Sequence, residues 1–164
     1  MAIDLDSDSI WEAVRLHLHT QLSATLSLKS FEQGSYFHIP PGDDLGALLP
    51  LCAIEWVSAE GRHLPGFSAI ELIHRVRIHY LCLLADTDVA TRKVAQALET
   101  IANTLCQPPY EGATALPGYT PGDRVNVFAK GAPTMRVEDT FTEMELPIGH
   151  GHVEIPVTIH YYND

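Results

Sequence analysis

The stretch from Ile70 to Leu105 constrains the fold most, because a two-residue period of apolar residues changes there into a helical period. From Ile70 to Leu84 one set of alternate residues is almost entirely apolar, which is typical of a strand lying with one face on a core. The opposite face is mixed and carries Glu71, Ile73, Arg75, Arg77, His79, Leu81 and Leu83. This stretch therefore predicts a long central strand that leads directly into a helix.

The helical part of this stretch has one apolar stripe. Its members recur every three or four residues and are Ala90, Val94, Ala97, Leu98, Ile101, Ala102 and Leu105. We expect Asp86 or Thr87 to cap the helix, because either side chain can accept a hydrogen bond from a free amide of the first turn. The Pro108-Pro109 pair ends the helix, since proline cannot continue it.

Around this unit we expect an α+β fold, with a mixed or antiparallel β-sheet packed against two α-helices and long Pro/Gly-rich loops. A single domain spans residues 1–164, a length that suits one core. The further elements are expected at 9–28 (helix) and at 36–39, 51–58, 124–129, 135–141 and 153–161 (strands), with a turn at 60–62 and a loop at 107–123. Pro156 cannot donate a backbone hydrogen bond, so it indicates an edge or a bulge in the last strand.

Composition excludes some classes of function. The net charge of −11, from 10 basic and 21 acidic residues, disfavours a sequence-independent nucleic-acid binder, which needs cations for the phosphates. No apolar run approaches the length of a membrane span, and the start resembles no secretion signal, so we expect a soluble protein made inside the cell. Cys52, Cys82 and Cys106 lie in apolar patterns without paired spacing, and we expect buried, reduced thiols.

Three local patterns have chemical character, and each has a plainer interpretation. His150 and His152 alternate as metal ligands on a strand do, but a turn with surface histidines is the stronger interpretation. Glu143 and Glu145 would share one strand face. The sequence shows no neighbour that would raise the pKa of one carboxyl group and lower that of the other, as a general acid and a general base require. The adjacent pair Asp43 and Asp44 lies in a Pro/Gly turn. Carboxylates in such turns usually accept hydrogen bonds from the turn's own backbone and face the solvent.

Sequence motifs of enzymes are also missing. The chain has no nucleophile elbow, phosphate-binding loop or His-Glu-x-x-His zinc motif. We therefore expect a protein that is not an enzyme and that holds neither a metal nor a cofactor.

The order of elements resembles the tail terminator (tail completion) proteins of long-tailed bacteriophages. The segments that carry the resemblance are the helix at Ser9–Leu28, the strand at Glu71–Tyr80, the Asp-started helix at Asp88–Leu98 and the closing strand at Val157–Tyr162. It covers most of the chain and is a pattern of elements rather than a signature. Residues 29–50 and 60–67 depart from that pattern.

The resemblance implies a structural virion protein that closes into a ring of six subunits. Such a ring caps the head-proximal end of the tail tube, stops tube elongation and presents the surface that joins the neck or connector. Its partners would be other copies of the chain, the tail tube protein, the neck or connector protein and, as a further candidate, the tail sheath. DNA would pass through the lumen without specific binding, no membrane would be involved, and the protein would act in the virion after assembly in the host cytoplasm.

The mixed face of the central strand fits a contact between subunits, because interfaces combine apolar centres with charged surroundings. The candidate residues for contacts with subunits or the tail are Asp43, Asp44, Arg62, Arg75, Arg77, His79, Tyr110 and Tyr119. A solvent-exposed sheet face with paired surface charges explains the same pattern.

Three other functions remain open at this stage. The nearest is another head–tail joining ring protein of the neck. A metal-dependent enzyme using His150, His152 and a carboxylate belongs to a different class, and a cellular adaptor domain is the third.

Overall fold

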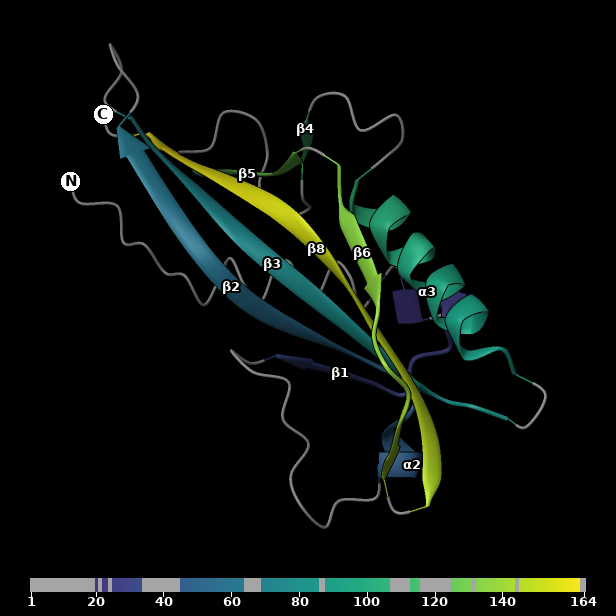
Figure 1. Ribbon diagram of the computed structural model, residues 1–164. Helices are drawn as coiled ribbons and strands as arrows, with labels where there is room; N and C mark the ends of the chain where they lie inside the picture. The colour runs from purple at the N-terminus through teal and green to yellow at the C-terminus, as the bar shows by residue number, and fades with distance from the viewer. Residues whose placement is uncertain are drawn as a thin grey trace.

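The chain folds around three long strands that run side by side and twist together (Figure 1). The computed structural model describes residues 20, 22–23, 25–33, 45–63, 69–85, 88–106, 113–115, 125–130, 132–143 and 145–162. The long strands are β2 (Leu51–His63), β3 (Ala69–Leu83) and β8 (Leu146–Tyr162), and the long helix is α3 (Ala90–Leu105). The shorter elements are β1 (Ser30–Gln33), α2 (Leu45–Leu48), β4 (Ala113–Ala115), β5 (Val125–Lys130), β6 (Thr134–Val137) and β7 (Phe141–Glu143).

The sheet is mostly antiparallel and has the strand order β1-β2-β3-β8-β5-β4, with β6 and β7 also paired to β8. β2 and β3 form the predicted hairpin, in which Glu55 lies opposite Arg77. β3 pairs with β8 along its whole length, so that His79 lies opposite His152. β1 pairs with β2 in the parallel direction, which makes the sheet mixed. The predicted α+β class is therefore confirmed.

Helix α3 covers one face of this sheet. Its stripe of Val94, Ala97, Leu98, Ile101 and Ala102 is buried in one cluster with alternate residues of the three long strands. The strand residues in this cluster are Cys52, Ile54, Val76, Ile78, Tyr80, Cys82, Val153, Ile155 and Val157. Burying each large aliphatic side chain contributes about 1.5–3 kcal/mol, so this cluster is a large source of stability.

Glycines let α3 approach β8 closely. A Cβ added at Gly149 would lie 2.9 Å from Val94 Cγ2, and one added at Gly151 would lie 2.8 Å from Leu98 Cδ1. Real Cβ atoms essentially never show such distances. The glycines beside His150 and His152 therefore serve packing, and they bring the helix down onto the strand.

The opposite sheet face has its own apolar cluster near the start of β8. Its buried members are Leu49, Leu51, Ala53, Leu81 and Ile148, and Leu48, Leu83 and Phe141 pack against it. Because α2 supplies Leu48, this short helix lies over the second face.

The long strands extend well past the helix (Figure 1). With its 17 residues, β8 spans roughly 55 Å at the usual rise of a strand, whereas the 16 residues of α3 span about 24 Å. Helix α3 therefore supports only one part of the sheet, and the end of the β2–β3 hairpin projects beyond it.

Several sequence predictions need correction. The described residues contain one long helix rather than two: of the predicted helix at 9–28, only Thr20, Leu22, Ser23 and Thr25 are described as helical, and most of it lies outside the described residues. The predicted turn at 60–62 is wrong, because β2 continues to His63. Instead, the pairing shifts between Trp56 and Ser58, which leaves Val57 as a bulged residue.

The ends of other elements also differ from the predictions. Helix α3 starts at Ala90 with Val89 as its N-cap and no side-chain hydrogen bond there, while Asp86 and Thr87 lie outside the described residues. Strands β1 and β4 were not expected. Apart from β4, the predicted loop at 107–123 lies outside the described residues, as does the predicted strand at 36–39. The predicted segment at 135–141 is divided between β6 and β7.

Pro156 lies in an internal strand rather than at an edge. On the outer side of β8, the described pairs with β5 end at Val157 and those with β6 begin at Glu154. The proline therefore lies where the neighbour of β8 on this side changes from β5 to β6. Its missing N–H costs no hydrogen bond in the pairs described on that side.

Candidate functional site

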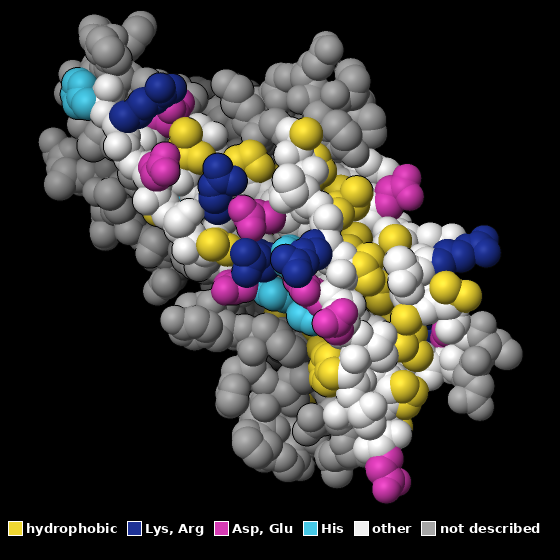
Figure 2. Space-filling model, in the orientation of Figure 1, with side chains coloured by type: hydrophobic (Ala, Val, Ile, Leu, Met, Phe, Trp, Pro, Cys, Tyr) yellow, Lys and Arg dark blue, Asp and Glu magenta, His cyan; other side chains and the backbone are white. Residues whose placement is uncertain are grey.

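The face of the sheet opposite α3 carries a group of charged and histidine side chains, which we call the polar cluster. Its members are Glu55, Arg75, Arg77, His79, Arg136, Glu138, His150, His152 and Glu154. Strand alternation explains the grouping, because the odd residues of β3 and the even residues of β8 point to this face. Figure 2 shows charged and histidine side chains gathered in the middle of the face that it presents.

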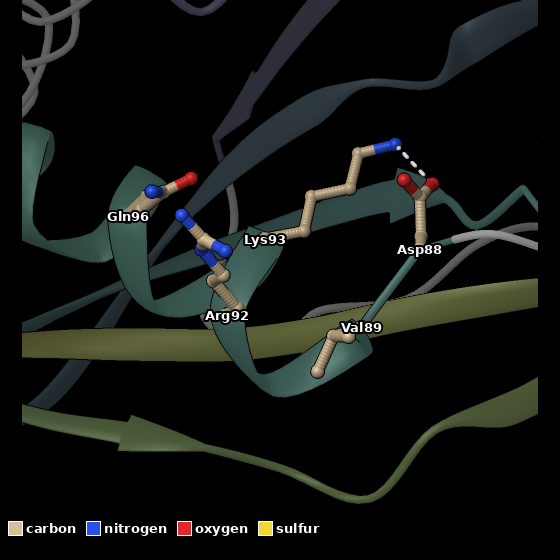
Figure 3. Close-up of a pocket in the computed structure, with 5 residues that line it drawn as sticks. All are labelled: Asp88, Val89, Arg92, Lys93 and Gln96. Carbon is tan, nitrogen blue, oxygen red and sulfur yellow. Dashed lines mark hydrogen bonds and ion pairs between the residues drawn. The ribbon is translucent and has the colours of Figure 1, made fainter.

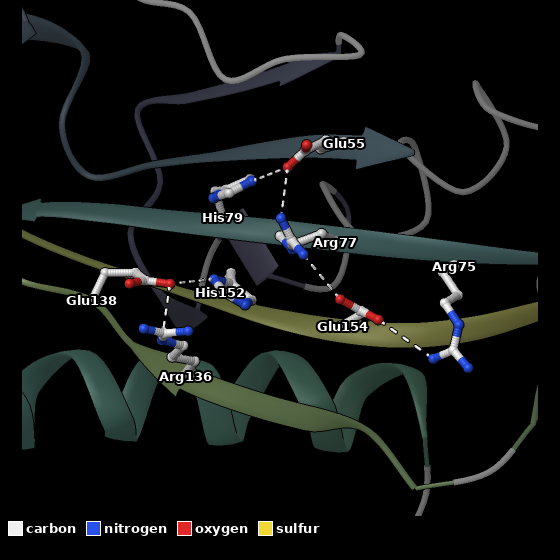
Figure 4. Close-up of polar contacts among 8 residues, drawn as sticks. All are labelled: Glu55, Arg75, Arg77, His79, Arg136, Glu138, His152 and Glu154. Carbon is white, nitrogen blue, oxygen red and sulfur yellow. Dashed lines mark hydrogen bonds and ion pairs between the residues drawn. The ribbon is translucent and has the colours of Figure 1, made fainter. Parts of the chain in front are cut away.

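Carboxylates and guanidinium groups alternate across the three long strands (Figure 4). Arg77 lies between Glu55, at 3.5 Å, and Glu154, at 3.2 Å. Glu154 also contacts Arg75 at 3.5 Å, which gives a chain of four charges running from β2 through β3 to β8. The Arg77 side chain is 29% exposed and that of Arg75 is 61% exposed, so screening by water weakens the Arg75 contact more.

Two histidines from different strands meet inside the cluster. His79 Nδ1 lies 3.0 Å from His150 Nε2, and His79 Nε2 lies 2.7 Å from Glu55 Oε2. The two imidazole rings are stacked, with centroids 5.3 Å apart. His79 is only 7% exposed, because it lies between its two partners on neighbouring strands. Glu55 accepts the Nε2 proton of His79, which leaves the other ring nitrogen for His150.

A second carboxylate holds His152. Glu138 Oε1 lies 3.1 Å from His152 Nδ1 and 3.4 Å from Arg136 Nε (Figure 4). Burial lowers the pKa of His152, and the positive charge of Arg77 adds to this effect. Burial also lowers the pKa of His150 to about 4, with a further contribution from His79. Both imidazoles are therefore neutral at physiological pH.

Within the described part of the chain, His150 and His152 do not belong to a group of three or more His, Cys, Asp or Glu side chains that could hold a metal ion. The ring nitrogens of His79 instead face Glu55 and His150, and Nδ1 of His152 faces Glu138. The structure also corrects the expected turn with surface histidines, since both residues lie in β8 and both are part-buried.

The structure brings together three of the predicted interface residues, Arg75, Arg77 and His79, within the polar cluster. Arg62 lies farther along the same face, where its Nε donates to the buried Glu71 carboxylate at 2.6 Å. The other four predicted residues, Asp43, Asp44, Tyr110 and Tyr119, lie outside the described residues.

No protein-family model matches this sequence, and no curated protein matches it. Within the described residues, no helix is long and apolar enough to cross a membrane.

Sequence reasoning missed the carboxylates of the cluster. Glu55, Glu138 and Glu154 are far apart in the chain, and only the strand register brings them to Arg77 and the histidines. The available signal was charge complementarity, since Glu55 is the one acidic residue in an otherwise apolar stretch of β2. Glu143 and Glu145 do not share a strand face, because β7 ends at Glu143 and Glu145 lies in a turn with a φ of 64°.

A surface hollow of about 350 Å³ lies beside the first turn of α3 (Figure 3). Its lining consists of Asp88, Val89, Arg92, Lys93 and Gln96. Lys93 Nζ donates to Leu83 O and to Asp88 Oδ2, both at 2.9 Å, so this amine is used to hold the helix to the end of β3. We assign the hollow no chemistry.

Proposed function

We propose that this chain is the tail terminator of a long-tailed bacteriophage, a structural protein that assembles into a ring of six and caps the tail tube. The observation that supports the proposal is the character of the sheet face opposite α3. There, charged and histidine side chains of the polar cluster gather in the middle of the face (Figure 2), and the Arg75 side chain within it is 61% exposed. Complementary charges are typical of the surfaces through which subunits recognise each other.

Arg75 is the cluster residue best suited to contact another subunit. Its side chain is mostly exposed, and its contact with Glu154 is 3.5 Å long. Such an exposed pair contributes little within one chain, so the guanidinium can be shared with a carboxylate of a neighbour. In a cyclic ring this contact is heterologous, one patch meeting a different patch on the next copy.

The acidic balance of the chain fits a passage for DNA. Six copies with a net charge of −11 carry −66 together. A lumen lined by part of this charge repels phosphates, so DNA passes without binding. The proposed partners are the tail tube protein and the neck or connector protein, with the tail sheath as a further candidate, and no cofactor is involved.

Electron microscopy of tail tubes assembled without a terminator tests this function. Adding the purified chain should give rings on one end of each tube and stop further growth in length. Arg75→Glu should weaken capping, because it places a carboxylate beside Glu154 and removes the proposed contact. Arg92→Glu, the same exchange at an exposed position of α3, is the matched control and should cap normally.

The outcomes separate the proposal from its nearest alternative. Rings that bind connectors and ignore tubes would identify a neck protein instead. A chain that binds neither tubes nor connectors and forms no ring would contradict a structural role in the tail.

A further inference from the structure

The tip of the β7–β8 hairpin carries an exposed carboxylate in a strained position. Glu145 has a φ of 64°, a conformation in which a residue with a Cβ is strained and which glycine adopts freely. Its side chain is exposed and forms no ion pair with another described residue. Strain kept at an exposed position points to a use for the side chain, so the question is which group receives this carboxylate.

The chain around the tip is acidic. Residues 138–145 contain four carboxylates, and residues 138–164 contain no lysine or arginine. Asp139 is exposed like Glu145. The complement of such a segment is a surface on which arginine or lysine side chains are outermost.

The sheet face opposite α3 has this character around Arg75. The side chain of Arg75 is 61% exposed and that of its partner Glu154 is 19% exposed. The pair of Arg136 and Glu138 repeats this order, with 73% against 28% (Figure 4). A molecule that approaches this part of the face therefore meets the guanidinium groups before the carboxylates.

Arg75 can hold a second carboxylate. Its contact with Glu154 is 3.5 Å long, whereas charge-assisted hydrogen bonds of this kind are usually about 2.7–2.9 Å, and a guanidinium has several N–H donors. Arg62 is less suited, because it donates to the buried Glu71 at 2.6 Å and the exposed Glu60 lies two residues away on the same face of β2.

One chain cannot bring its own Glu145 to its own Arg75. In the register of β3 with β8, Arg75 lies opposite Pro156, ten residues after Leu146, where β8 begins. This separation is roughly 33 Å along the strand. A contact between the two residues therefore joins two copies through different surfaces, and heterologous contacts of this kind can close into a ring.

We propose that Glu145 of one copy pairs with Arg75 of the next, so that the β7–β8 hairpin tip of each subunit lies on the sheet face of its neighbour. The inference rests on the proposed ring, since it names the two surfaces that join its subunits. The exposed guanidinium of Arg136 adds to the positive potential that receives the tip. Because the charges are exposed, added salt should weaken the contact.

Exchange of the two charges tests the contact in the capping of tail tubes. Arg75→Glu and Glu145→Arg should each raise the concentration of chain that caps half of the tubes by about tenfold or more, since like charges then meet at every contact. The double variant restores opposite charges and should cap within about threefold of the unmodified chain. Arg92→Glu combined with Glu145→Arg is the matched control and should stay impaired, because position 92 lies on α3.

Cross-linking tests the same contact by proximity. A chain with both Arg75→Cys and Glu145→Cys, treated on capped tubes with a short bismaleimide, should form covalent multimers. The native cysteines are buried and should not interfere. A chain with Arg92→Cys and Glu145→Cys is the control and should remain largely monomeric.

The outcomes separate this contact from the proposed function. If the unmodified chain caps tubes but the double charge exchange stays as impaired as its single variants, the contact is overturned and the capping function stands. Cross-linking from position 92 as strong as that from position 75 has the same meaning. If the unmodified chain caps no tube and forms no ring, both proposals are overturned.

Discussion

Gly151 lies directly against Val94, so close that a Cβ at position 151 would be 2.7 Å from Val94 Cγ1. Glycine in a strand interior usually weakens the strand, since it adds no packing and loses much entropy on folding. Here the missing side chain allows α3 to reach β8. The cost of the glycine is therefore offset by the buried contacts of Val94 and Leu98.

Gly151→Ala should lower the free energy of unfolding by about 2–3 kcal/mol, because the added methyl group overpacks the contact between helix and strand. The added Cβ would also lie 2.9 Å from the backbone carbonyl oxygen of Arg136, which cannot move as easily as a side-chain end. Urea denaturation at pH 7.5 measures the change. Gly149→Ala meets only side-chain atoms and should cost less, about 1 kcal/mol.

Val94→Ala should partly rescue Gly151→Ala, since it removes the two methyl carbons of Val94, one of them the atom nearest the added Cβ. The double-mutant cycle should give a favourable coupling of about 1 kcal/mol or more. Strictly additive effects would show that the helix does not rest on Gly151.

Arg77→Met should cost about 1–2 kcal/mol in the free energy of unfolding, because it leaves Glu55 and Glu154 without their shared cation in a part-buried site. The matched change Arg75→Met should cost less than about 0.5 kcal/mol, since that side chain is mostly exposed. Thermal and urea denaturation of the two variants measure the two losses in the free energy of unfolding. Equal losses would contradict the order of burial seen in the cluster.

Glu145→Gly should stabilise the chain by about 0.5–1 kcal/mol, because Glu145 has a φ of 64° and glycine adopts that conformation without a Cβ clash. Thr142→Gly in the neighbouring strand is the control, and it should destabilise by a similar amount because strand glycines lose entropy. The melting temperatures of both variants measure the difference. A loss of stability in Glu145→Gly would mean that the glutamate makes a contact worth more than the strain.

The three cysteines should resist a thiol reagent in the folded chain. All three are buried, and burial raises the pKa of each thiol, that of Cys106 to about 11, so the reactive thiolate is scarce at pH 8. Labelling should be at least about 100-fold slower than in urea, since it requires unfolding. Ser58→Cys adds an exposed thiol and should react at once.

Periodicity predicted the parts of the fold that depend on local pattern. The alternation around Val76 and Ile78 located β3 and its buried face, and the stripe around Val94 and Ile101 located α3. The buried thiols were predicted for the same reason. Each of these features depends on residues close together in the chain, where burial repeats with the period of the element.

Features that depend on register could not be predicted. The pairing of His79 with His150 joins residues 71 positions apart, and a shift of one residue between β3 and β8 would turn every side chain of one strand to the other face. Gly61 resembled a turn, although it lies inside β2 beyond the bulge at Val57. Glycine is ambiguous in a single sequence, because turns, bulges and close packing all favour it.

Because β2, β3 and β8 all extend past α3, a small change in twist at their supported end is amplified at their far end. A change of about 5° in twist at the supported end moves a tip some 30 Å away, at the rise of a strand, by roughly 2.5 Å. The ion pair of Arg62 and Glu71 lies near that tip and would travel with it. A small change in strand twist beneath α3 thus displaces the far end of the strands enough to alter its contacts with a neighbouring molecule.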